Sequence, residues 1–185
     1  MSSNAYKQVA NVILDKACNL SESEREALKG LLDGFSSDQL QISFPSYSIT
    51  VNYDLSVEQL IQASMFSWFN DSVVSRHFPS SEKGVAEILV FLVNFNRDIS
   101  SKDVIRELDR QGFRPATLKE LLALSIAHPD LQRNNCIVAF GSIWCDSGGG
   151  VFVPYLYGGE SGRDLNLGGW SGVWYSHWQF AAVRR

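Results

Sequence analysis

The stretch AEILVFLVNF, residues 86–95, is the strongest strand signal in the chain, and the segments that follow it decide the fold class. A helix follows with Ser100 in its N-cap position. Thr117-x-x-Glu120 is a capping box that opens a second helix, and Pro129 ends it. Beyond these helices the pattern predicts only strands, separated by glycine-rich turns, at residues 137–144, 151–157, 164–167 and 179–183. The order β-α-α-β-β-β-β predicts an α+β fold.

The residues before this domain predict an accessory region. Two short helices are expected first, one with Val9, Ile13 and Ala17 on one face and one opened by Ser21-x-x-Glu24. Residues 47–53 alternate apolar and polar positions, which predicts a half-buried strand, and Ser56-x-x-Gln59 caps a further helix. The aromatic residues between 66 and 79 are expected to form an irregular packed connection. We therefore expect an N-terminal helical extension with one strand at residues 1–81 and the main domain at residues 82–185.

Composition and charge narrow the function classes. The 185 residues are 45% hydrophobic and 19% charged, which is typical of globular proteins and excludes global disorder. A formal net charge of -4 and the absence of Lys and Arg clusters argue against a nucleic-acid partner. Cys18, Cys136 and Cys145 are widely spaced and predict free thiols rather than a metal site. The chain shows neither a signal-peptide pattern nor an apolar run long enough to span a bilayer, so we expect no membrane insertion and a cytoplasmic or virus-borne location.

Residues 141–178 have an unusual composition. They contain ten of the 14 glycines and four of the five tryptophans, together with three tyrosines and five serines, and no lysine. Such a mixture of rigid aromatic and small polar residues is typical of recognition surfaces. Large aromatic residues are nevertheless mostly buried, and we expect Trp144 and Trp174 to belong to the core. For Trp170 and Trp178 a buried position and a ligand-facing position both remain open.

Several motifs in this order resemble the formylglycine-generating-enzyme type of C-type-lectin fold, and within it the variable proteins of diversity-generating retroelements. The resemblance covers roughly the last hundred residues and depends on GFRPATLKELL (112–122), IVAFGSIW (137–144), VPYL (153–156), RDL (163–165) and the closing Trp174 with FAAVRR (180–185). In such proteins a retroelement rewrites adenine-containing codons near the C-terminus, and the fold presents the altered side chains on one exposed face. The closing strand of the family would pair with residues 86–95.

The resemblance also assigns residues to roles. Scaffold positions would be Arg114, Trp144, Pro154, Trp174, Phe180 and Val183. Candidate variable, ligand-binding positions are Cys145, Asp146, Ser147, Tyr155, Tyr157, Asn166, Ser171, Tyr175, Ser176, His177 and Trp178. Many of these residues can arise from an asparagine codon by adenine replacement, although Trp178 cannot. We expect Tyr155, Tyr157, Tyr175 and Trp178 to contribute most to binding.

Catalysis and other binding modes are the alternatives. The enzyme of this fold family uses a cysteine pair, but a buried, inert Cys136 is expected, and Cys145 lacks an evident partner. Ser176, His177 and Asp164 could form a triad, but no nucleophile elbow marks them. Too few carboxylates follow residue 140 for a calcium-dependent lectin. We therefore expect a non-catalytic protein without cofactor or metal that binds a protein or other macromolecule. Two further alternatives remain open, a lectin-like module with a fixed ligand and docking of a partner through the N-terminal helices.

Overall fold

The structure is a computed structural model that describes residues 21, 23, 44–159 and 162–185. The chain divides into two compact units, Met1–Ser43 and Phe44–Arg185. This division lies well before the boundary expected between residues 81 and 82. The two helices predicted before residue 44, with Val9, Ile13 and Ala17, lie outside the described residues apart from Ser21 and Ser23.

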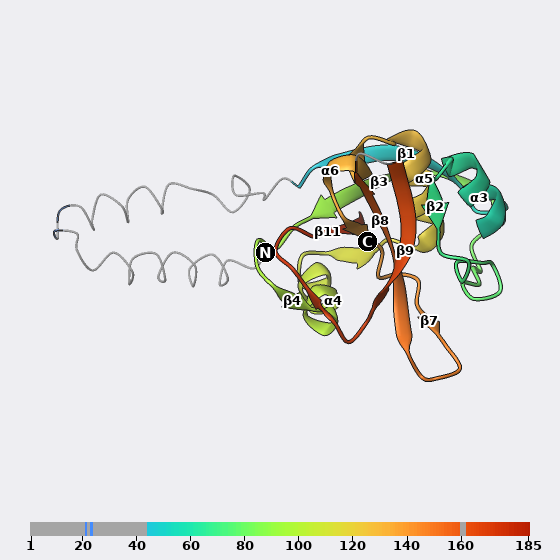
Figure 1. Ribbon diagram of the computed structural model, residues 1–185. Coiled ribbons are helices and arrows are strands. Elements are labelled where there is room, and N and C mark those ends of the chain that lie inside the picture. Colours follow the sequence, from blue (N-terminus) through green and yellow to red (C-terminus); the bar gives the residue numbers. More distant parts are fainter. Residues whose placement is uncertain (1–20, 22, 24–43, 160–161) are drawn as a thin grey trace. The chain divides into compact units, whose positions relative to one another are not determined.

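One large mixed sheet forms the centre of the second unit (Figure 1). Its strand order is β1 (Ser46–Asn52), β3 (Val85–Val93), β11 (Gln179–Arg184), β6 (Ile137–Val138), β8 (Val151–Gly159), β9 (Gly162–Gly169) and β2 (Trp68–Phe69). Off this path, β5 (Phe113–Pro115) pairs with β11 and β7 (Trp144–Cys145) pairs with β8, while β4 (Ile99–Ser100) and β10 (Val173–Trp174) form a separate pair. The last strand, β11, pairs antiparallel with β3, with Phe180 opposite Val93. The expected pairing of the closing strand is therefore confirmed.

Four helices accompany the sheet in the described residues: α3 (Val57–Ser64), α4 (Ser101–Arg110), α5 (Leu118–Ala127) and α6 (Leu131–Asn134). The α+β class is thus confirmed. The caps predicted for α3, α4 and α5 are present, since Ser56 and Thr117 each open a complete capping box and Ser100 accepts a hydrogen bond from the Asp103 N–H. Figure 1 shows α3 and α4 at opposite ends of this unit. The short α6 was not predicted, because four residues are too few to show a helical periodicity in the sequence.

Two hydrophobic clusters make up the core. One joins α3 and α5 to the sheet through residues such as Val51, Leu60 and Leu121. The other, which includes Phe140 and Trp174, lies among α4, β11 and the segment after β9. In β1 the odd-numbered residues face inward, as the alternation predicts. Residues of β1 and α3 therefore belong to the same core as the C-terminal strands.

Two predicted segments differ from the structure. Residues 137–144 are not one strand, because the chain leaves the sheet after β6 and Gly141 packs on the backbone of Ala116, where a Cβ would come within 2.6 Å of the Ala116 carbonyl oxygen. The connection at residues 66–79 is not wholly irregular either. Its residues Trp68 and Phe69 form β2, a two-residue edge strand parallel to β9.

Candidate ligand-binding face

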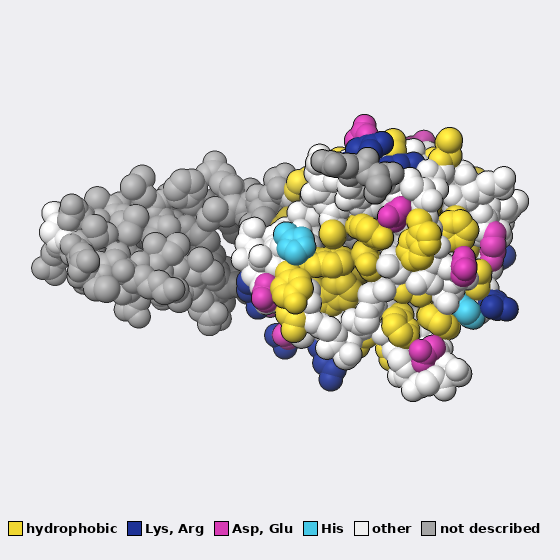
Figure 2. All heavy atoms as spheres, viewed as in Figure 1, with side chains coloured by type: hydrophobic (Ala, Val, Ile, Leu, Met, Phe, Trp, Pro, Cys, Tyr) yellow, Lys and Arg dark blue, Asp and Glu magenta, His cyan; other side chains and the backbone are white. Residues whose placement is uncertain are grey.

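A continuous row of aromatic rings crosses one surface of the 44–185 unit. Tyr157 and Tyr155 project from the same face of β8, with ring centroids 5.5 Å apart. Tyr155 meets Trp178 edge to face at 5.1 Å. The centroid of the His177 ring lies 6.1 Å from that of Trp178, and the centroid of the Tyr175 ring lies 6.2 Å from that of His177. Figure 2 shows hydrophobic side chains gathered over β8, β9 and the segment that leads into β11.

The neighbouring strands β9 and β2 widen this surface. Asn166 lies opposite Tyr155, and Asp164 lies opposite Tyr157 on one side and Trp68 on the other. Directly paired residues project from the same side of a sheet. We call the combined surface the aromatic face, and it comprises Trp68, Tyr155, Tyr157, Asp164, Asn166, Tyr175, His177 and Trp178.

Hydrogen bonds from the end of β3 fix residues 175–178. The Asn94 side-chain amide donates to the carbonyl oxygens of Ser176 at 2.8 Å and Trp178 at 2.9 Å. The Ser176 N–H donates to a carboxylate oxygen of Asp98 at 3.0 Å. This segment has few residues in regular structure, and these bonds fix the backbone that carries its aromatic side chains.

Trp174 forms the floor beneath the row. Its side chain is 4% exposed and meets the Trp178 ring at 4.9 Å, nearly perpendicular. The indole N–H donates to the Ser101 hydroxyl at 2.8 Å, and that hydroxyl donates to the Trp170 carbonyl oxygen. A Cβ at Gly168 would come within 2.6 Å of the Trp174 ring, so only glycine lets the indole pack against β9. The exposed rings thus have a rigid base.

The two tyrosines of β8 remain protonated over a wide pH range. Burial raises the pKa of Tyr155, although the Asn166 amide opposes this effect. Burial, followed by the charge of Asp164, also raises the pKa of Tyr157. Tyr155 and Tyr157 therefore contribute neutral phenol groups to the aromatic face at physiological pH.

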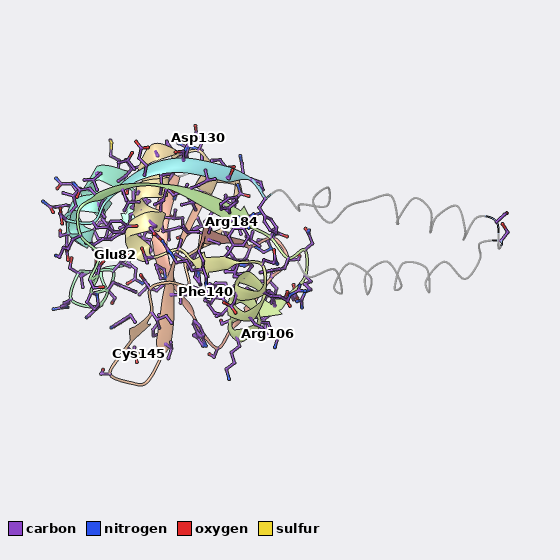
Figure 3. All side chains as sticks on the ribbon, turned by 180° about the vertical axis from the view of Figure 1, so that it is seen from behind. Glu82, Arg106, Asp130, Phe140, Cys145 and Arg184 are labelled. Carbon is purple, nitrogen blue, oxygen red and sulfur yellow. The ribbon has the colours of Figure 1, made fainter. Side chains whose placement is uncertain are left out.

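Candidate positions on the β7–β8 hairpin lie apart from the aromatic face. Cys145, Asp146 and Ser147 line a shallow hollow of about 650 Å³, which His77 and Trp144 also line, with their rings stacked at 4.6 Å. The Asp146 carboxylate accepts hydrogen bonds from two backbone N–H groups of its own turn, at 2.9 and 2.7 Å. Figure 3 labels Cys145 on this projecting hairpin.

The structure thus separates the sequence-predicted binding residues. It gathers six of them, which are Tyr155, Tyr157, Asn166, Tyr175, His177 and Trp178, and the backbone of Ser176 belongs to the same segment. The three hairpin residues form a second patch, and Ser171 is exposed in the turn between β9 and β10. Sequence reasoning missed Trp68 as a member of the face and considered Asp164 only for a catalytic triad and for a calcium site. No sequence pattern marks Trp68, because its neighbour Asp164 is 96 residues away.

The expected scaffold residues lie mostly in the interior. The side chains of Trp174, Phe180 and Val183 are 4%, 1% and 7% exposed, and Pro154 is buried. Trp144 is only partly buried, contrary to the core position expected for it. The difference arises because Trp144 lies on the projecting β7–β8 hairpin, where its ring contacts only His77 and Phe152 among the aromatic side chains of the described residues.

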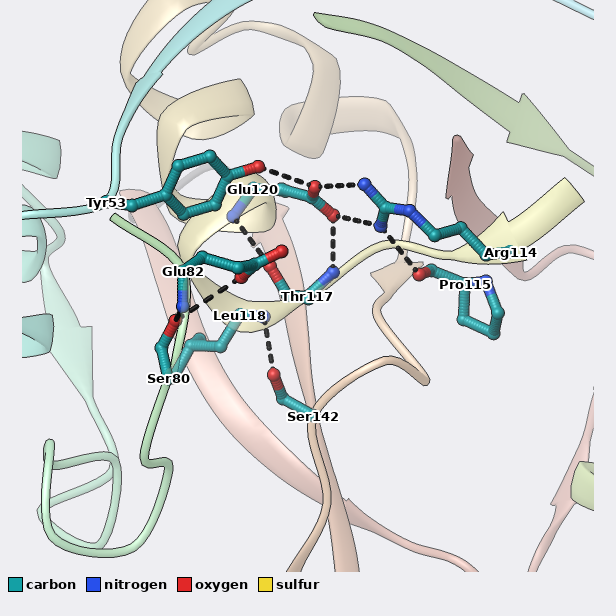
Figure 4. Close-up of polar contacts among 9 residues, drawn as sticks. All are labelled: Tyr53, Ser80, Glu82, Arg114, Pro115, Thr117, Leu118, Glu120 and Ser142. Carbon is teal, nitrogen blue, oxygen red and sulfur yellow. Dashed lines mark hydrogen bonds and ion pairs between the residues drawn. The ribbon is translucent and has the colours of Figure 1, made fainter. Parts of the chain in front are cut away.

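Arg114 is part of a buried polar network (Figure 4). Its guanidinium donates two hydrogen bonds, at 2.9 and 2.6 Å, to the fully buried carboxylate of Glu120. Glu120 also accepts hydrogen bonds from the Tyr53 hydroxyl at 2.8 Å and the Thr117 N–H at 2.7 Å. Burial alone would raise the pKa of Glu120, but the bonds from Arg114 and Thr117 hold it below its ordinary value. The network joins β5, the start of α5 and the end of β1.

The described residues give little support to catalytic groupings. Cys136 and Cys145 are free thiols, and burial raises the pKa of Cys136, the opposite of what activates a thiol nucleophile. Among the described residues no three His, Cys, Asp or Glu side chains come together as metal ligands. His77 and His128 each contact a backbone carbonyl oxygen. No described helix is long and apolar enough to cross a membrane.

Comparisons with known proteins return no relative, since no family model, curated protein or solved structure matches the chain.

Proposed function

We propose that this protein is a non-catalytic binding protein that recognises a protein or another macromolecule through its aromatic face. The observation that carries this proposal is the continuous row from Tyr157 to Tyr175, whose rings are only partly buried. Partly exposed Tyr and Trp side chains provide large contact area with few rotatable bonds, and such residues dominate binding energy at interfaces. The rigid floor at Trp174 limits the entropy lost on binding.

We further propose that the domain has the C-type-lectin-like arrangement and that a retroelement diversifies its surface. The burial pattern supports this division of roles. None of the candidate variable positions is buried, whereas four of the scaffold positions are. The pairing of β11 with β3 agrees with the same arrangement.

Binding through the aromatic face is tested with two matched fourfold variants of the full chain. The first replaces Tyr155, Tyr157, Tyr175 and Trp178 with alanine. The control replaces exposed apolar residues elsewhere, namely Met65, Val85, Leu89 and Ile126. Both are measured by surface plasmon resonance against the proteins and glycans that bind the wild type in an array. We expect the first variant to lose binding by at least about a hundredfold and the control to retain it. Retained binding in the first variant would refute the assignment of the face.

Diversification is tested by sequencing the neighbourhood of the gene. We expect a reverse-transcriptase gene and a near-copy of the C-terminal coding segment that differs mainly at adenines. Finding neither would leave a binding protein with a fixed ligand. The differing codons would identify the variable positions directly, and the hairpin residues 145–147 would then show whether the second patch also takes part.

A further inference from the structure

One carboxylate of the aromatic face lies between two aromatic side chains. Trp68, Asp164 and Tyr157 are successive partners across β2, β9 and β8, so their side chains form one cross-strand row. Trp68 is 48% exposed, and Asp164 and Tyr157 are partly exposed. Figure 2 shows acidic groups beside hydrophobic ones on this face. The row is therefore open to a ligand.

The backbone beneath the row is held firmly. The buried side chain of Gln132 donates hydrogen bonds to the carbonyl oxygens of Tyr157 at 2.9 Å and Asp164 at 3.2 Å. Its own amide oxygen accepts a hydrogen bond from the Ser125 hydroxyl at 2.8 Å. On the other side of β9, hydrogen bonds of 2.8 and 2.9 Å from the residues that flank β2 hold Trp68 against it. The three side chains thus keep their spacing without a ligand.

No basic side chain neutralises this row from within the described residues. The ion pairs found there do not include Asp164. The adjacent Arg163 lies on the opposite face of β9, where its guanidinium donates to the carbonyl oxygens of Ser125 and Ser64. Arg133, on the nearby α6, pairs with Asp130 at 3.1 Å. The row therefore combines an unneutralised carboxylate with two aromatic rings.

We propose that the Trp68–Asp164–Tyr157 row is a subsite for a cationic side chain of the partner, such as lysine or a methylated lysine. This inference depends on the binding role proposed for the aromatic face. Neighbouring strands lie about 4.8 Å apart and directly paired side chains project side by side, so a cation bound at Asp164 would lie next to the rings of both neighbouring strands. That spacing suits attraction to aromatic faces, which acts within about 6 Å of a ring centroid. The carboxylate supplies a negative charge opposite the cation, and this electrostatic complementarity favours the correct orientation of the partner.

The test uses tetramethylammonium chloride as a probe and tert-butanol as its neutral counterpart of similar shape. Both are titrated into the ¹⁵N-labelled full chain at constant ionic strength, and the indole N–H signal of Trp68 is followed by NMR. We expect a saturable shift with tetramethylammonium and a much weaker one with tert-butanol. Asp164→Asn and Trp68→Ala should each weaken the binding of tetramethylammonium by about fivefold to tenfold, with the Tyr157 amide as the second reporter. The matched control Glu87→Gln, at an exposed position of β3, should leave it unchanged.

Three results would overturn the subsite. They are the absence of saturation, equal shifts with both probes, or full affinity in Asp164→Asn with an otherwise unchanged spectrum. Loss of this subsite does not remove the proposed function, because the fourfold alanine variant tests the whole face against a macromolecule. Conversely, saturable binding of tetramethylammonium by a protein that binds no macromolecule would leave a cation site at this row and refute the proposed function.

Discussion

At the scale of single residues, Glu120 connects segments that are far apart in the sequence. Its carboxylate is fully buried and accepts hydrogen bonds from Arg114 and Thr117 of the same stretch of chain and from Tyr53, which is 67 residues away. No polar side-chain atom that is buried in the described residues lacks a partner. Removing one partner of a buried ion pair costs more than the pair contributes, because the remaining charge is left without compensation.

Arg114→Ala is therefore expected to lower the free energy of unfolding by about 3 kcal/mol, near the lower end of the range for buried pairs because the arginine side chain is itself partly exposed. Urea unfolding followed by tryptophan fluorescence measures the change. The matched control is Arg106→Ala, which removes an exposed pair with Asp103 and should cost at most about 1 kcal/mol. Equal effects of the two variants would show that the network does not stabilise the fold.

The lowered pKa of Glu120 also predicts a dependence of stability on pH. A carboxyl group whose pKa is lower in the folded state stabilises the protein above its ordinary pKa, and this stabilisation is lost as the pH falls through the folded-state value. We expect the free energy of unfolding to decrease as the pH drops below 4.5, the ordinary pKa of this side chain. In Glu120→Gln the decrease should be less steep. Urea titrations between about pH 6 and 3 measure both slopes. Hydrogen bonds from Ser75 lower the pKa of Glu58 to about 2, so Glu58 also contributes to the pH dependence of stability. Glu58→Gln is therefore measured in parallel.

At the scale of elements, the edge strand β2 depends on a glycine in β9. Gly162 has φ +147°, and a Cβ there would lie 1.8 Å from the Ser67 hydroxyl oxygen. Gly162→Ala should therefore displace β2 and move Trp68 away from Asp164, while the main core remains intact. Hydrogen exchange of the amide groups of Ser67 and Asn70 should accelerate by at least about tenfold. The control Gly159→Ala, where a Cβ meets nothing within 4 Å, should leave exchange unchanged, and slow exchange in both variants would contradict the prediction.

The elements that the sequence predicts correctly are those with local signals. The capping residues Ser56 and Thr117 mark α3 and α5 because their bonding partners are three residues away. A strand of two residues such as β2 has no periodicity to detect, and its parallel pairing with β9 forms only in the folded chain. The break after β6 is equally hidden, since it depends on the approach of Gly141 to Ala116.

At the scale of the whole molecule, the composition of residues 141–178 predicts a recognition surface but not which residues share it. Alternation along β8 is enough to place Tyr155 and Tyr157 on one side. Their contact with Trp178 depends on the order of strands in the sheet, and this order also brings in Trp68 and leaves the β7–β8 hairpin aside. Closeness in the sequence is therefore a poor guide to which residues belong to the aromatic face.

The same non-local organisation sets the extent of the folding unit. β1 pairs along its length with β3, and residues of β1 and α3 such as Val51 and Leu60 complete the first core cluster. A fragment of residues 44–185 should therefore unfold in one cooperative transition and keep a dispersed NMR spectrum. A fragment of residues 82–185, which starts at the boundary that the sequence predicts, lacks β1, α3 and β2. Its exposed core surface should leave it without fixed tertiary packing, which near-UV circular dichroism and urea unfolding of both fragments would detect. Cooperative unfolding of the shorter fragment would instead make the first 81 residues an accessory region, and the face would then have to form without Trp68.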